Sequence, residues 1–169
     1  METSKLKKLV LSALMAALTC ITTMVIPIPT PSGGYAHPGD GFVLLSGAIL
    51  GPIYGGLAAA VGSFLADLFL GYSEYMIATF FIKGLAAVLA ALIYRYIHKG
   101  STIIAGIAGG AVVTLGYLLF EIILFGPGVA ISGIPMNLVQ NVLGILISVF
   151  ILPILRKIPQ IKEIINEKS

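Results

Sequence analysis

Positive charge in this chain is confined to the flanks of long apolar stretches. Nine of its ten Lys and Arg residues form three groups, which are Lys5, Lys7 and Lys8; Arg95 and Lys99; and Arg156, Lys157, Lys162 and Lys168. The apolar stretches between these groups are long enough to cross a bilayer. Because basic residues stay on the cytoplasmic side of membrane proteins, the pattern predicts a multi-pass membrane protein.

The composition leaves little room for a region outside the membrane. Of the 169 residues, 58% are hydrophobic and 10% are charged, whereas roughly a quarter of the residues in soluble domains are charged. We therefore expect residues 1–169 to form a single integral-membrane domain. The net charge of +3 reflects the basic residues that flank the membrane spans on the cytoplasmic side. No nucleic-acid partner is expected, because the sequence lacks a basic face with interleaved aromatic residues.

The first membrane span is predicted at Leu6–Ile28. Its apolar run is about 20 residues long, which exceeds the roughly 7–15 residues of a secretory signal core, so we expect this span to be retained. The segment Pro29–Asp40 has no Lys or Arg and is expected to be an extracellular loop. Later spans are predicted at Tyr75–Ile97, Thr102–Phe125 and Pro135–Leu155.

The segment Gly41–Gly71 is interrupted by Gly51-Pro52 and Gly55-Gly56. A single crossing here would place Lys8 and Arg95 on opposite sides of the membrane, against the positive-inside rule. A helical hairpin that turns near Gly51–Tyr54 keeps both in the cytoplasm. The fold class predicted is therefore all-α, with six transmembrane helices and both termini cytoplasmic.

Polar residues within the spans gather in the outer half of the predicted bundle. Asp67 and Glu121 lie about 6–8 Å from the outer ends of their helices, and Lys83 lies about 12 Å deep, at 1.5 Å per residue. Three amides, Asn137, Gln140 and Asn141, share one helical face with Gly144. Intramembrane ionisable residues usually face a cavity, so the distribution predicts a pocket that opens to the outside.

Each of these residues also has a structural interpretation. Lys83 either forms a buried ion pair with Asp67 or Glu121 or contacts a ligand, and Asp67 is given a structural role first. The three amides either join helices or bind a heteroaromatic ligand, since amides both donate and accept hydrogen bonds. In the loop and at its borders, the candidates for ligand contact are Tyr35, His37, Asp40 and Tyr75, which otherwise serve as turn residues or interfacial aromatics.

Sequence motifs for catalysis or for ATP hydrolysis are missing. The chain has no G-x-x-x-x-G-K-[ST] phosphate loop, no H-E-x-x-H and no G-x-S-x-G. The pair His37 and Asp40 lacks a third ligand at a suitable spacing for a metal. We expect a binding subunit with no cofactor or metal, and not an enzyme.

Several motifs together resemble those of energy-coupling factor (ECF) transporter S components, most closely the riboflavin, hydroxymethylpyrimidine and pyridoxine group. They extend over nearly the whole chain and are P29-TPSGGYAHPG-D40, G51-PIYG-G56, A66-D67 with G71-Y72, I82-K83-G84 and N137-x-x-Q140-x-x-x-G144. Ala13 and Ala17, four residues apart in the first span, fit the same pattern.

The resemblance implies a six-helix substrate-binding subunit of the bacterial plasma membrane that captures a vitamin outside the cell. It implies docking through Ala13 and Ala17 on a T subunit, with two ABC-type ATPases supplying energy, and a substrate site built from the first loop and helices four to six. The acidic residues Asp40, Asp67 and Glu121 outnumber Lys83 in the outer half. We therefore expect a neutral or weakly basic heteroaromatic, such as pyridoxine or hydroxymethylpyrimidine. The alternatives are riboflavin as substrate, or an autonomous small secondary transporter.

Overall fold

The structure, a computed structural model, describes residues 2–97 and 101–166. Lys99 and Lys168, two members of the basic groups expected in the cytoplasm, lie outside the described residues. The elements in chain order are α1 (Glu2–Val25), β1 (Ile28–Pro29), β2 (Tyr35–Ala36), α2 (Asp40–Leu70), α3 (Met76–Leu92), the π-helical turn η1 (Ile93–Ile97), α4 (Thr102–Phe125), α5 (Pro127–Leu155) and α6 (Pro159–Asn166).

Helix α2 reverses direction at Gly51, as the charge pattern predicted. Gly51 has φ 83° and ψ −175°, a conformation that essentially only glycine adopts. The two halves of α2 then pack against each other, because a Cβ on Gly55 would lie 2.3 Å from the carbonyl oxygen of Ser46. In a continuous helix these two residues would be about 13 Å apart. Arg95 closes the turn by donating from Nη2 to the Ile49 carbonyl at 2.8 Å.

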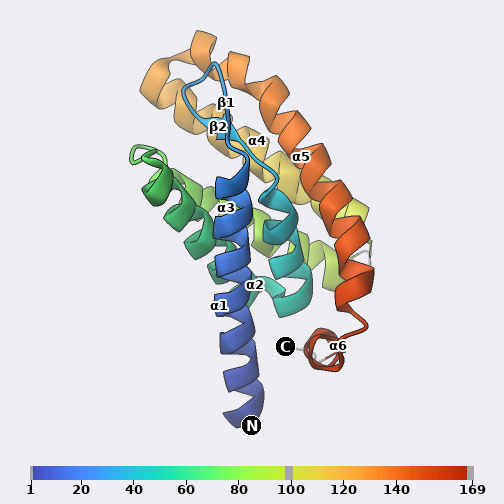
Figure 1. The fold of residues 1–169 in the computed structure, drawn as a ribbon. Coiled ribbons are helices and arrows are strands. Elements are labelled where there is room, and N and C mark those ends of the chain that lie inside the picture. Colours follow the sequence, from blue (N-terminus) through green and yellow to red (C-terminus); the bar gives the residue numbers. More distant parts are fainter. Residues whose placement is uncertain (1, 98–100, 167–169) are drawn as a thin grey trace.

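Among the described residues, five helices are long and apolar enough to cross a membrane, and α2 is one of them. Its reversal gives six membrane-crossing segments, so the predicted six-helix fold of a multi-pass membrane protein is confirmed. Both chain ends lie at the same end of the bundle, with the β1–β2 hairpin at the other (Figure 1). The basic groups at Lys5–Lys8 and Arg156–Lys157 lie on the side of the termini, which is the cytoplasmic side by the positive-inside rule.

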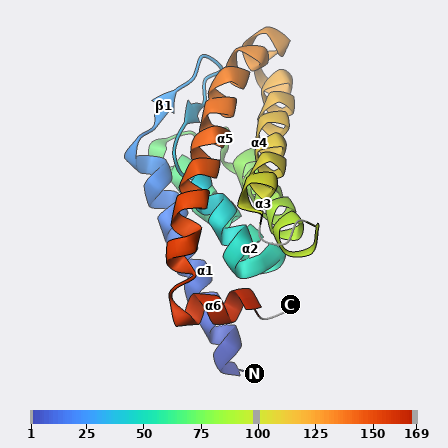
Figure 2. The same ribbon diagram turned by 90° about the vertical axis from the view of Figure 1, so that its right-hand side faces the viewer.

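Two boundaries differ from the sequence prediction. Helix α5 begins at Pro127, eight residues before the expected Pro135, which lies inside the helix. Gly126 ends α4 with φ 84°, and Pro127 then occupies the first turn of α5, where its missing N–H needs no partner. The short helix α6 was not predicted. It lies across the cytoplasmic end (Figure 2), buries Ile161 and Ile164, and is tied to α1 by a 3.0 Å ion pair between Lys7 and Glu163.

Helix α2 forms the centre of the bundle. In its most apolar window 72% of the residues are buried, against 28% in α1 and 22% in α5. Small residues permit this close packing, since a Cβ on Gly62 would lie 2.4 Å from the Ala16 carbonyl oxygen of α1. Ala13 and Ala17 point away from this contact and are exposed. The internal helix packing therefore does not use these two alanines, through which the family resemblance implies docking on a T subunit.

Candidate functional site

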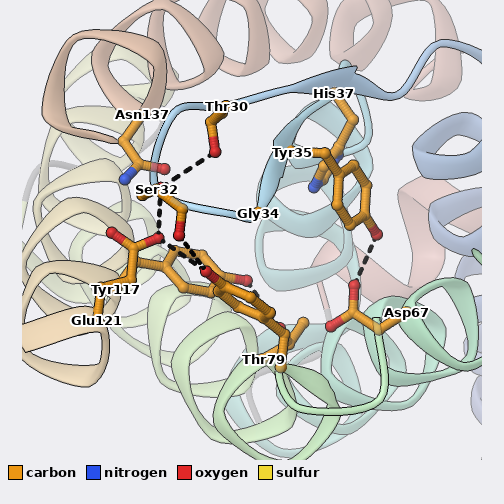
Figure 3. A pocket seen from close by; sticks show the side chains of 11 residues that line it. Thr30, Ser32, Gly34, Tyr35, His37, Asp67, Thr79, Tyr117, Glu121 and Asn137 are labelled. Carbon is orange, nitrogen blue, oxygen red and sulfur yellow. Dashed lines mark hydrogen bonds between the residues drawn. The ribbon is translucent and has the colours of Figure 1, made fainter. Parts of the chain in front are cut away.

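A narrow pocket lies at the outer end of the bundle, under the loop of residues 26–39 (Figure 3). It holds about 360 Å³ of space free of protein atoms, part of it open to solvent. The loop, the second half of α2 and helices α3, α4 and α5 all contribute to its wall. The lining residues are Thr30, Ser32, Gly34, Tyr35, His37, Asp67, Tyr75, Thr79, Tyr117, Glu121 and Asn137.

The loop of residues 26–39 forms the roof of this pocket by folding into a small antiparallel hairpin. Ile28 pairs with Ala36 and Pro29 with Tyr35. Gly33 turns the chain with φ 88°, and the Thr30 amide donates to the Gly34 carbonyl at 2.9 Å. The hairpin directs the side chains at the turn toward the helices below (Figure 3).

One side of the pocket is built around Glu121 of α4, whose side chain is almost fully buried. Ser32 Oγ donates to Glu121 Oε1 at 2.8 Å. Tyr75 Oη lies 3.3 Å from the same oxygen and 3.0 Å from the Ser32 carbonyl oxygen. Burial raises the pKa of Tyr75, which keeps its hydroxyl a donor. In the described part of the chain, Glu121 Oε2 is buried and has no hydrogen-bond partner.

The opposite side of the pocket is built around Asp67 of α2. Tyr35 Oη donates to Asp67 Oδ1 at 2.6 Å, which joins the roof loop to the second half of α2. The rings of Tyr35 and Tyr72 lie 4.5 Å apart, centroid to centroid. Thr79 and Tyr117 share a 2.9 Å hydrogen bond on the pocket floor. Asp67 therefore lines the pocket, and its carboxylate faces Tyr35 instead of Lys83.

Lys83 lies beneath the pocket and is fully buried. Its Nζ is 2.5 Å from Asp40 Oδ1, so its partner is neither Asp67 nor Glu121, the two considered from the sequence. Asp40 Oδ2 accepts from Gln140 Nε2 at 2.8 Å, and Gln140 Oε1 accepts from the His37 backbone amide at 3.1 Å. These four residues form one connected polar network that joins α3, α2, α5 and the loop.

The imidazole of His37 is neutral in this environment. Its Nδ1 accepts a hydrogen bond from the Gly39 amide at 3.2 Å, which requires an unprotonated nitrogen. Burial and, second, the nearby positive charge of Lys83 lower the pKa of His37 to about 3, against an opposing effect of Asp40.

The three amides of α5 have different surroundings. Asn137 lines the pocket. Gln140 belongs to the network with Asp40 and His37, and Asn141 donates to the Gly110 carbonyl and to Thr114 Oγ1 of α4 at 2.9 and 2.8 Å. Gln140 and Asn141 therefore join elements of the bundle, whereas the side chain of Asn137 borders the pocket.

Of the candidates named from the sequence, five line the pocket: Tyr35, His37, Tyr75, Glu121 and Asn137. Sequence reasoning missed Thr30, Ser32, Thr79 and Tyr117. Helical spacing would have found two of them, because Thr79 is four residues before Lys83 and Tyr117 four residues before Glu121, on the same helix faces.

Comparison with known proteins agrees with the fold. A family model described as the S component of ECF-type riboflavin transporters matches residues 3–157. An uncharacterized protein of Pyrococcus woesei is 38% identical over 133 residues, covering 75% of this chain and 86% of the relative. The thiamine precursor transporter HmpT of Lactococcus lactis subsp. cremoris is 26% identical over 160 residues, covering 93% and 92% of the two chains.

A solved structure of the S component of a bacterial ECF transporter superposes with a TM-score of 0.68 at 20% identity, covering 90% of this chain and 97% of that one. At this identity the likeness shows the fold. It agrees with the six membrane-crossing segments described above.

Proposed function

The chain belongs to the family of ECF-type riboflavin transporter S components, and on this premise we propose that it is the substrate-binding subunit of an importer for a small heteroaromatic vitamin or vitamin precursor. It is a multi-pass membrane protein and not an enzyme. The pocket under the loop of residues 26–39 is the proposed capture site, and hydroxymethylpyrimidine or pyridoxine is the proposed cargo.

The observation that carries this proposal is the charge of the pocket wall. Two buried carboxyl groups, Glu121 and Asp67, lie on opposite sides of the pocket (Figure 3), while the nearby Lys83 is paired with Asp40 outside the lining. No Lys or Arg is among the lining residues that the structure describes. Burying an anion between two carboxyl groups is unfavourable. The pocket therefore favours a ligand with hydrogen-bond donors or positive charge, as in an aminopyrimidine or a pyridine alcohol.

The comparisons bear on the choice between a single-ring cargo and a flavin. The relative HmpT is a thiamine precursor transporter by name, which agrees with a pyrimidine. Riboflavin remains the second candidate because the family model carries that description.

The proposed assembly includes a T subunit and two ABC-type ATPases. Ala13 and Ala17 are exposed on α1, while Ala16 of the same helix packs on Gly62. A small-residue face that internal packing leaves free allows the close approach of a partner helix in lipid. We assign this face to the T subunit.

The test is uptake of labelled hydroxymethylpyrimidine and pyridoxine by cells that express this chain with or without an ECF module. The proposal expects uptake with the module and at most background without it. Strong uptake by the chain alone would favour an autonomous secondary transporter. Mass spectrometry of small molecules that co-purify with the chain checks the cargo independently, and a bulky anionic vitamin as the tight ligand would contradict the charge argument.

A further inference from the structure

The network beneath the pocket connects a buried ion pair to the backbone of the roof loop. We propose that Lys83, Asp40 and Gln140 are positioning residues, which hold the loop of residues 26–39 in its ligand-binding conformation without touching the ligand. This proposal rests on the function proposed above, because the loop supplies pocket-lining residues.

The ion pair has little freedom to serve a ligand directly. The Lys83 side chain is fully buried and does not line the pocket, and its Nζ lies 2.5 Å from Asp40 Oδ1. Asp40 is also almost fully buried, and its second oxygen is occupied by Gln140. An isolated charge at this depth is strongly disfavoured, so each of the two ionised groups requires the other.

The carboxylate of Asp40 determines how the Gln140 amide is oriented. A carboxylate only accepts hydrogen bonds, so it must face the amide nitrogen of Gln140, not the amide oxygen. Nε2 accordingly donates to Asp40 Oδ2 at 2.8 Å. This leaves Oε1 directed at the loop, where it accepts from the His37 backbone amide at 3.1 Å.

The consequence is that α2, α3 and α5 act together on one backbone amide of the roof. Ser32, Gly34 and Tyr35 precede that amide by a few residues and line the pocket. Releasing His37 would free the carboxyl-terminal side of the hairpin. The lining residues of the loop would then sample other positions. Ligand binding would have to order these residues, and the free-energy cost of that ordering would reduce the ligand affinity.

A double substitution separates positioning from direct contact. Lys83→Met alone leaves Asp40 uncompensated, and we expect ligand affinity to fall by about 30-fold or more. Adding Asp40→Asn removes the second charge while keeping an oxygen that accepts from Gln140. The double variant K83M/D40N should therefore bind within about threefold of the wild type, since replacing both members of a buried pair is often neutral. The ligand probes are hydroxymethylpyrimidine and pyridoxine, titrated against the full chain in detergent.

A folded double variant that binds as poorly as K83M would overturn the proposal, because it would show that the Lys83 ammonium contacts the ligand. Should the double variant fail to fold, Gln140→Leu provides a second test. This variant keeps the Lys83–Asp40 pair and removes both hydrogen bonds of the amide. Ser148→Ala is the matched control, since Ser148 is buried on the same helix and, among the described residues, its hydroxyl donates to the Ile145 carbonyl of α5 alone.

Hydrogen exchange of the peptide that contains His37 gives a readout without ligand. We expect exchange at this amide to become at least about tenfold faster in Q140L and to remain unchanged in S148A. Unchanged exchange in Q140L would contradict the positioning role. The experiments distinguish failure of the proposed cargo from failure of the positioning role. If the wild type binds neither probe but the His37 amide exchanges faster in Q140L, the proposed cargo is wrong and the positioning role of the network is supported.

Discussion

Tyr35 donates a 2.6 Å hydrogen bond to Asp67, and this bond joins the roof loop to the second half of α2 on one side of the pocket. The two residues are 32 positions apart in the chain and belong to two different elements of the pocket wall. The roof is held on the other side by Ser32 and Glu121. Two carboxyl groups, those of Asp67 and Glu121, thus accept hydrogen bonds from the roof loop and also line the pocket.

Removing the Tyr35 hydroxyl should loosen the attachment of the roof loop to α2 and thereby weaken ligand binding. In Tyr35→Phe, Asp67 Oδ1 loses its donor, and an unsatisfied buried acceptor costs about 1–3 kcal/mol. We expect about a tenfold or greater loss of affinity by isothermal titration. Tyr72→Phe is the control, because it keeps the ring contact with Tyr35. Equal losses in both variants would argue against a specific role of the Tyr35–Asp67 bond.

Glu121 offers a test of whether charge or hydrogen bonding holds the ligand. Glu121→Gln keeps an oxygen that accepts from Ser32 and Tyr75, so the roof should remain in place. If the ligand is cationic or donor-rich, the lost charge should still reduce affinity about tenfold, equivalent to about 1.4 kcal/mol. Glu121→Leu should reduce both affinity and melting temperature. Ligand affinity is measured by titration. If Glu121→Gln binds the ligand as tightly as the wild type, the charge of Glu121 does not contribute to specificity.

The exposed face of α1 predicts a loss of transport without a loss of binding. Replacing Ala13 and Ala17 with Leu blocks the close approach of a partner helix, but touches no buried contact of the bundle. We expect uptake with an ECF module to fall at least about tenfold, and ligand affinity to remain unchanged. Ala111→Leu is the control, since Ala111 is equally small and exposed on α4. If binding is lost in the double variant, the two alanines serve internal packing.

Burial of neutral His37 predicts reduced stability in acid. The folded protein has a His37 pKa of about 3, against the ordinary 6.5, so between these values the unfolded chain binds more protons. The stabilising contribution is complete above pH 6.5 and is lost as the pH falls toward 3. At pH 5 the loss should reach about 2 kcal/mol.

The measurement for His37 is the melting temperature in detergent at pH 7.5 and pH 5.0, for the wild type and His37→Asn. Asparagine retains an acceptor for the Gly39 amide but does not titrate in this range. We expect the wild type to lose more stability than the variant between the two pH values. Parallel losses would mean that other groups cause the pH dependence.

The sequence predicted the architecture well because two strong rules govern it. The lengths of the apolar stretches determined the predicted spans. Lys8 and Arg95 both had to lie on the cytoplasmic side, which required α2 to reverse direction, and the backbone of Gly51 makes that reversal. The start of α5 was misplaced because Pro135 looks like a first-turn proline, whereas Pro127 occupies that position. Helix α6 was missed because eight amphipathic residues are too short to give a reliable periodic signal.

The side-chain partners were harder to predict, because they depend on helix rotation and on the path of the loop. Asp40 was treated as a loop residue, although it is the first residue of α2 and pairs with Lys83 of the neighbouring helix α3. Ser32 and Thr30 are ordinary turn residues in sequence, and only the fold of the β1–β2 hairpin brings them over Glu121. The outer-half polar cluster was recognisable, but its division into lining and supporting residues was not.

The most direct test of the central claim is titration of the purified wild-type chain with hydroxymethylpyrimidine, pyridoxine, riboflavin and folate under identical conditions. The pocket wall, with two carboxyl groups and no lining cation among the described residues, predicts that one of the two small uncharged or weakly basic compounds binds at least about a hundredfold more tightly than folate, a difference of about 2.7 kcal/mol. Tightest binding of the anionic folate would contradict the claim.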